Sequence, residues 1–104
     1  MIIVNTDFVI GKEIKEILGL VRGNTIQAKS IGKDIKAGFR HMVGGEIKEY
    51  TLMLAESREI ALKRMEAKAK KMGADAVINV RFMTSSIMGG AAEILAYGTA
   101  VKLK

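Results

Sequence analysis

The chain has 104 residues, the length of one domain, and we expect a single domain spanning residues 1–104. It contains 17 basic and 11 acidic residues, for a net charge of +6, with one His and no Cys. The lack of cysteine excludes disulfides, thiolate metal sites and cysteine nucleophiles, and a single histidine excludes HExxH zinc sites. No apolar run approaches the roughly 18 residues of a membrane helix. Asp7 follows the apolar start too soon for a secretory signal, so we expect a cytoplasmic α+β protein.

The first part of the chain has the pattern of β-strands. Ile2–Val4 is a short β-branched run, and Ile14–Ala28 predicts a long second strand. A helix through Lys12–Leu18 is the alternative, because apolar residues there also fit a helical stripe. Gly19 and Gly23 count against that helix and indicate a bulge or a close backbone approach within a strand.

Two helices are predicted in the middle of the chain. Residues Ser30–Val43 are loop-like with a short helix, which Gly44 and Gly45 end. Glu46–Met72 is the strongest helical pattern, and Gly73 ends it. Its apolar face carries the stripe Ile47, Tyr50, Leu54, Ser57, Ala61, Met65, Ala69 and Met72. The small members of this stripe would let the helix lie close to a sheet.

The length of this helix conflicts with a compact domain. It would be roughly 40 Å long at the usual rise per residue, whereas a compact domain of this size is about 30 Å across. We therefore expect the helix to be kinked, to start later, or to pack partly on another subunit.

The last part of the chain predicts a β-hairpin. Ala76–Met83 alternates, with Ala76, Ile78, Val80 and Phe82 on one face. Ile94–Leu103 alternates too, and its two faces are Leu95, Tyr97, Thr99, Val101 and Leu103 against Ile94, Ala96, Gly98 and Ala100. Thr84–Ala92 would be the long connecting loop. The elements together predict a small antiparallel sheet covered by one long helix.

The predicted sheet has more apolar surface than one helix can cover. Residues on both faces are apolar around Ile17–Val21 and again around Ile94–Tyr97. Another copy of the chain is the simplest cover for the second face, and the alternative is that the short helix covers it. We therefore predict that the chain is its own partner in a homo-oligomer.

The densest polar stretch is Arg40–Glu46, where two glycines precede a helix N-terminus, a generic arrangement for binding anions. A plain joint between two helices explains the same stretch, and we favour that interpretation. His41, Glu46 and Glu49 are weak candidates for metal ligands, because zinc normally takes about four ligands and one chain offers too few. We therefore predict no cofactor and no metal.

Three further polar residues lie near the apolar stripes: Tyr50, Arg58 and Asn79. Arg58 is predicted to contact a carboxylate or backbone carbonyls, from its own fold or a neighbouring chain, because an unpaired buried charge is costly. No catalytic constellation is visible, so a non-enzymatic protein is favoured. Nucleic acid is not predicted as a partner, because the helix dipole accounts for the one basic cluster, Lys68–Lys71.

Several separated blocks resemble the YbjQ-like family. These blocks are Gly19–Gly23, Arg40, Gly44–Glu46 with Tyr50, Arg58–Ala61, Gly73–Arg81 and Ala96–Val101. The family is uncharacterised and is described as heavy-metal-binding. The resemblance implies a dodecin-like α+β subunit that assembles as a ring-shaped homopentamer. It also implies that any functional site falls on Arg40, Gly44, Gly45, Glu46, Tyr50, Arg58 and Asn79.

Three hypotheses for the function stay open. The first is a non-enzymatic homo-oligomer that binds a small anionic ligand at its subunit interfaces. The second is a metal-handling protein, as the family description suggests, although a chain without cysteine is a poor ligand for soft metals. The third is an enzyme with an interface site built from Arg40, Glu46, Tyr50 and Arg58.

Overall fold

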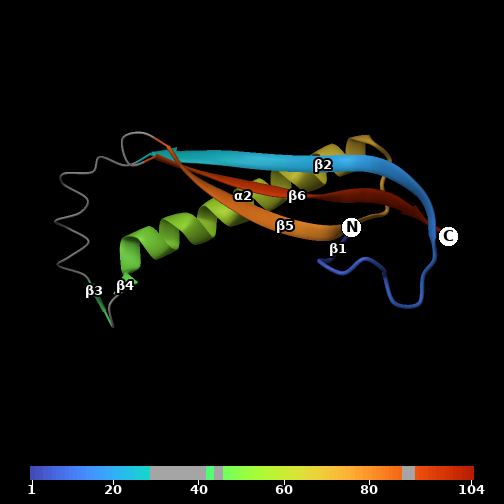
Figure 1. Cartoon of the computed structure of the whole chain (residues 1–104), viewed down its shortest axis with the longest axis horizontal. Coiled ribbons are helices and arrows are strands. Elements are labelled where there is room, and N and C mark those ends of the chain that lie inside the picture. The colour runs from blue at the N-terminus through green and yellow to red at the C-terminus, as the bar shows by residue number, and fades with distance from the viewer. Residues whose placement is uncertain (29–41, 44–45, 88–90) are drawn as a thin grey trace.

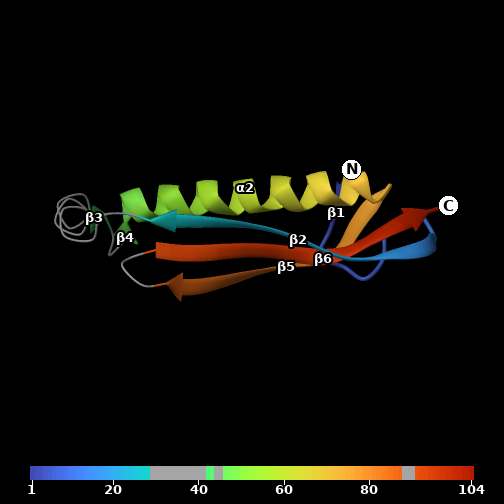
Figure 2. The ribbon, with the colours of Figure 1, turned by 90° about the horizontal axis from the view of Figure 1, so that it is seen from above.

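The computed structural model describes residues 1–28, 42–43, 46–87 and 91–104, with side chains over 1–27, 51–87 and 91–104. Its elements are β1 (Ile2–Ile3), β2 (Ile14–Ala28), β3 (Met42–Val43), β4 (Glu46–Ile47), α2 (Lys48–Lys71), β5 (Ala76–Ile87) and β6 (Ala91–Leu103). The predicted α+β fold is confirmed. The helix α2 forms one layer that lies along one face of a four-stranded sheet, as Figures 1 and 2 show from two sides.

The sheet is mixed rather than antiparallel, which corrects the prediction. Its strand order is β1-β5-β6-β2, and β1 runs parallel to β5 while the other pairs are antiparallel. Ile2 and Ile3 pair with Ala76 and Val77, and the amide of Val4 donates to the carbonyl of Val77 at 3.0 Å. Strand pairing through backbone groups leaves no mark on the alternation of side chains, so the direction of such a short strand is not visible in the sequence.

The long strand β2 has the predicted bounds, Ile14–Ala28, and the helical alternative over 12–18 is wrong. Register shifts between Ile14 and Glu16 and between Ile17 and Gly19 mark bulges, and Gly19 adopts a φ of 135° that side chains avoid. The predicted bulge in this stretch is therefore confirmed.

The predicted close backbone approach is made by Gly23, which is buried under α2. A Cβ added to this glycine would lie 2.8 Å from the carbonyl carbon of Arg64 and still closer to the amide of Met65 and the carbonyl of Ala61. The helix backbone thus rests directly on the strand. Ser57, Ala61 and Ala69, the small residues of the predicted stripe, are all buried, as this approach requires.

The helix α2 begins two residues later than predicted and ends at Lys71. Its end has the bonds of a Schellman motif: the amide of Gly73 donates to Lys70 and that of Ala74 donates to Ala69, at 3.0 and 3.1 Å. At about 36 Å the helix still fits, because the molecule is elongated, measuring 53 × 26 × 16 Å. The assumption of a compact domain was the wrong one.

The short helix predicted over 30–43 is wrong at its end. Met42–Val43 is a strand that pairs with Glu46–Ile47, and the rest of the segment lies outside the described residues. The helix stop predicted at Gly44 and Gly45 also lies outside the described residues. Within the described part of the chain, no helix is both long enough and apolar enough to span a bilayer.

The hairpin of β5 and β6 is confirmed, but the long loop predicted over 84–92 is wrong, because pairing continues to Ile87 and Ala91. The predicted faces of β6 are confirmed by its alternating burial. Those of β5 are wrong, because a register shift between Ile78 and Arg81 moves Val80 to the face opposite Ile78. A bulge of this kind reverses the alternation for the rest of the strand.

The two faces of the sheet carry separate cores. The face under α2 holds the larger one, with Val21, Val77, Ile94 and Ala96 packed against Met65 and its neighbours. On the other face, Ala76, Ile78 and Val101 pack under Val4 and Val9 of the N-terminal segment, at one end of the sheet only. None of residues 1–28, 42–43, 46–87 and 91–104 covers the remainder of that second face, which we call the open face.

Candidate functional site

Most of the residues predicted to form a site lie outside the part of the chain whose side chains the structure describes. Arg40, His41, Gly44 and Gly45 are outside the described residues. Glu46 lies in β4, and Glu49 and Tyr50 lie in the first turn of α2, but their side chains are not described. The predicted anion loop and the weak metal candidates therefore stay predictions.

Arg58 lies on the exposed side of α2. Its guanidinium donates no hydrogen bond to, and forms no ion pair with, any other residue whose side chain or backbone the structure describes. Ser57, one residue earlier, is buried, and its hydroxyl donates to the carbonyl of Met53 at 2.8 Å within the helix. The contact predicted for Arg58 is thus absent among the described residues, and its predicted source stays either the rest of the fold or a neighbouring chain.

Asn79 has a structural explanation. It adopts a φ of 53°, in the left-handed region that asparagine tolerates better than most residues, and it sits in the bulge of β5. The backbone N–H of Asn79 donates to the carbonyl of Thr6 at 2.8 Å, and the backbone N–H of Val80 donates to the carbonyl of Val4 at 3.1 Å. The bulge thereby fastens the N-terminal segment to the sheet.

Replacing Asn79 distinguishes this backbone role from a ligand-binding role. We expect Asn79→Gly to retain the free energy of unfolding, because glycine adopts a positive φ readily, and Asn79→Val to lose about 1–2 kcal/mol. Urea denaturation followed by circular dichroism measures both. An equal loss in the two variants would show that the side chain, rather than the backbone angle, is what the position requires.

The open part of the second sheet face carries several exposed apolar side chains. Leu20, Ile26 and Met83 are 64%, 57% and 53% exposed, far above the usual exposure of such side chains in a sheet. Strand register places the following residues on this open face: Leu20, Arg22, Asn24 and Ile26 of β2, Arg81, Met83, Ser85 and Ile87 of β5, and Glu93, Leu95 and Tyr97 of β6. The prediction that one helix leaves a sheet face uncovered agrees with the described part of the chain, and the short helix predicted as the alternative cover lies outside that part except at Met42–Val43.

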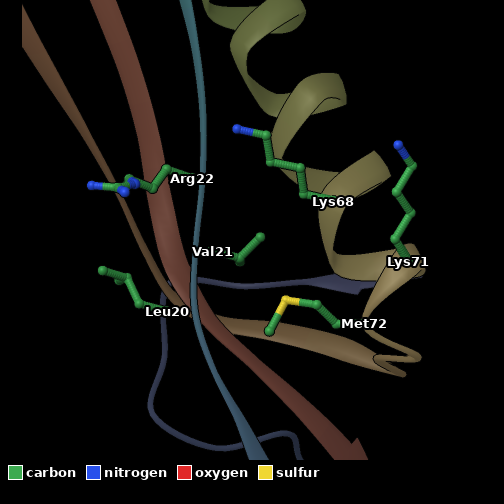
Figure 3. A pocket seen from close by; sticks show the side chains of 6 residues that line it. All are labelled: Leu20, Val21, Arg22, Lys68, Lys71 and Met72. Carbon is green, nitrogen blue, oxygen red and sulfur yellow. The ribbon is translucent and has the colours of Figure 1, made fainter.

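A second feature, which we call the edge groove, runs beside the outer edge of β2. It has a volume of about 270 Å³ and is lined by Leu20, Val21, Arg22, Lys68, Lys71 and Met72. Figure 3 shows Lys68 and Lys71 on α2 on one side of the strand, while Leu20 and Arg22 point away on the other side. Cationic side chains therefore lie on both sides of the outer edge of β2.

Sequence reasoning did not single out this groove. The sequence pattern attributes Lys68–Lys71 to the helix dipole, and Arg22 enters only as part of Gly19–Gly23, a block that resembles the family. Within the helix, Lys70 pairs with Glu66 at 3.2 Å, an i,i+4 pair that the sequence also predicts. What brings Arg22 beside Lys68 is the close packing of α2 on Gly23, and no local pattern states which helix turn rests on which strand residue.

Metal ligands do not gather in the part of the chain that the structure describes. No group of three or more His, Asp or Glu side chains in these residues is arranged to hold an ion. Acidic side chains there are instead used singly, as where Asp75 accepts the amide of Leu103 at 2.9 Å.

Comparison with known proteins identifies the family. A family model described as "Putative heavy-metal-binding" matches residues 1–104. The chain is 65% identical to a UPF0145 protein of Methanosarcina acetivorans over 99% of this chain and 97% of that protein. It is 61% identical to a UPF0145 protein of Archaeoglobus fulgidus, covering 100% of this chain and 96% of the relative.

A solved structure shares the fold. It is a crystal structure of a protein of unknown function in the DUF74 family from Pediococcus pentosaceus, with a TM-score of 0.69 at 17% identity. The match covers 100% of this chain and 98% of that one. The family model and the close relatives agree over the whole length, and the chain therefore belongs to the YbjQ family of UPF0145 proteins.

Proposed function

We propose that this protein is a non-enzymatic homo-oligomer, a ring of five chains as the family resemblance implies, that binds a small anionic ligand where subunits meet. The observation that carries the proposal is the open sheet face, whose apolar residues come from three adjacent strands. Contiguous apolar surfaces of this kind are rare on monomers and mark contacts with other molecules.

A second copy of the chain is the occupant that the surface favours. The outer edge of β5 from Arg81 onward has no partner among the described strands, so a neighbouring copy gains backbone hydrogen bonds as well as apolar contacts. The open face carries both Arg22 and Glu93, which allows opposite charges to meet between copies. A contact between two different surfaces of the same chain closes into a ring when the rotation permits.

The anionic part of the proposal rests on charge. The chain has a net charge of +6, and Arg58 presents an unpaired guanidinium on the surface of α2 within the described residues. Guanidinium groups bind carboxylates and phosphates through paired hydrogen bonds, so this cation suits a small anion. That the exposed side of α2 also meets a neighbouring subunit is part of the proposal.

Assembly is tested by light scattering on the wild-type protein and on Met83→Asp. We expect a wild-type mass near that of five chains, and at least a ~10-fold higher dissociation constant for Met83→Asp, because a charge would be buried in an apolar contact. Thr84→Asp is the matched control, since the neighbouring side chain points to the opposite face. A wild-type monomer at micromolar concentration, or equal effects of the two variants, would contradict the proposal.

Metal handling is the second candidate, and the description of the family is what favours it. We expect no stoichiometric tight binding of Zn²⁺, Cu²⁺ or Cd²⁺, because the chain has no Cys and one His. Calorimetric titration of protein purified without an affinity tag measures this. One submicromolar site per chain that His41→Ala abolishes would make metal handling the function instead.

A further inference from the structure

The edge groove exposes backbone groups as well as side chains. The carbonyl of Asn24 accepts a hydrogen bond from Nη1 of Arg64 at 2.8 Å, so the backbone groups of this residue face away from β6. Backbone groups alternate in direction along a strand, and those of Leu20 and Arg22 therefore face outward too. No described strand pairs with this edge. The free stretch ends at Asn24, where Arg64 already occupies the carbonyl.

Cations lie on both sides of this free stretch. Lys68 and Lys71 approach from α2, and Arg22 lies on the open sheet face (Figure 3). Among the described residues, none of these three cations is paired with an acidic side chain. Lys70, which lies between Lys68 and Lys71 in the sequence, differs because it pairs with Glu66. Leu20 and Met72, which are 64% and 39% exposed, add apolar surface beside the cations.

The excess of positive charge is smaller at the Asn24 end of the edge. A neighbouring hollow shares Arg22 and Lys68 with the edge groove but is also lined by Asn24, Glu93 and Leu95. There the carboxylate of Glu93 accepts a hydrogen bond from Nδ2 of Asn24 at 3.0 Å. An anionic occupant is therefore favoured more strongly at the Leu20–Arg22 end, which has no carboxylate in its lining, than at the Asn24 end.

We propose that the edge of β2 from Leu20 to Arg22 binds a short acidic peptide segment in extended conformation, as an added strand. Side chains of an extended segment alternate between the two faces of a sheet. Two consecutive acidic residues would thus reach Lys68 and Lys71 on one side and Arg22 on the other, while the backbone pairs with β2. A compact anion could not contact cations on both sides of the strand in this way.

The occupant comes from another protein rather than from a second copy. The eleven acidic residues of this chain are never closer than three positions apart, so it offers no adjacent pair. The proposed self-assembly uses the open face and the edge of β5 at the other side of the sheet. Leu20 and Arg22 belong to that face as well, whereas Lys68, Lys71 and the free backbone of β2 are not used by it.

Fluorescence anisotropy with labelled peptides tests the proposal at low ionic strength. The probe is an acetylated and amidated peptide with the sequence Val-Thr-Asp-Glu-Thr-Val, and the matched peptide carries Asn-Gln in place of Asp-Glu. We expect the acidic peptide to bind at least ~10-fold more tightly than its amide counterpart. Absence of binding, or equal binding of the two peptides, would overturn the proposal.

Protein variants locate the site. Lys68→Met and Lys71→Met should each weaken binding of the acidic peptide at least ~5-fold. Lys70→Met removes the same charge from the same helix turn outside the groove, and binding should be unchanged. If Lys70→Met weakens binding as much as Lys68→Met, the peptide responds to net charge alone and the groove is not its site.

Backbone methylation of the peptide tests strand addition itself. An added strand pairs through every second amide, so N-methylation of one alternating set should abolish binding and methylation of the other set should leave it intact. Tolerance of both patterns would overturn strand addition. A short single-stranded oligonucleotide that competes with equal affinity would show a general polyanion surface instead. Light scattering on the same samples reports self-assembly separately, so failure of one proposal is distinguishable from failure of the other.

Discussion

Gly23→Ala is expected to lower the free energy of unfolding by about 3 kcal/mol or more. The added Cβ would lie 2.8 Å from the carbonyl carbon of Arg64 and closer to the amide of Met65, and these are backbone atoms of α2 that no rotamer change can move. The helix would have to lift away from β2, which opens the larger core along that line. Urea denaturation at a fixed chain concentration measures the loss, since self-assembly makes stability depend on concentration.

Gly11→Ala is the matched control for this substitution. Gly11 has a φ of 80°, and a Cβ added there meets nothing within 4 Å. We expect a loss of about 1 kcal/mol from the left-handed backbone alone. A loss at Gly23 no greater than at Gly11 would mean that the helix does not rest on the strand as described.

Met65→Ala is expected to cost about 2–5 kcal/mol. Met65 is fully buried and is among the largest of the fully buried side chains, at the centre of the contact between α2 and the sheet. Truncation removes apolar contacts and leaves a cavity that the rigid sheet below cannot fill. The same denaturation experiment, with the slope against urea compared between variants, measures the change.

Leu52→Ala serves as the control on the same helix. Leu52 is 61% exposed, so the single chain loses little buried surface on its truncation, and we expect a change within about 0.5 kcal/mol. Equal losses at Leu52 and Met65 would contradict the placement of the helix, because one side of α2 would then be no more buried than the other.

Local pattern predicted much of the fold. The bounds of β2 were predictable because β-branched residues and two glycines, Gly19 and Gly23, disfavour a helix over that stretch. The end of α2 was predictable because Gly73 adopts the left-handed conformation that closes a helix. The small residues of the helix stripe also indicated its close approach to a sheet, which Gly23 accepts.

The errors share a physical cause. The predicted faces of β5 were wrong because one bulge at Asn79 reverses the alternation of side chains along the strand. An asparagine within a strand pattern does not by itself predict the left-handed backbone that Asn79 adopts. The long loop over 84–92 was wrong because Thr84, Ser85 and Ser86 read as loop but pair with β6. Backbone pairing with a distant strand overrides the weak local preference of such residues.

The candidate sites, too, could be predicted from the sequence only in part. The sequence by itself determined the chemistry that is available: no thiolate, one imidazole, an excess of cations, and apolar strands with two apolar faces, because these follow from composition and alternation. Only the tertiary structure decided which cations meet. Arg22 and Lys68 are 46 positions apart, and they line one groove because α2 packs directly on Gly23. Such a contact depends on the register between a helix and a strand, which packing sets and which the periodicity of either element leaves free.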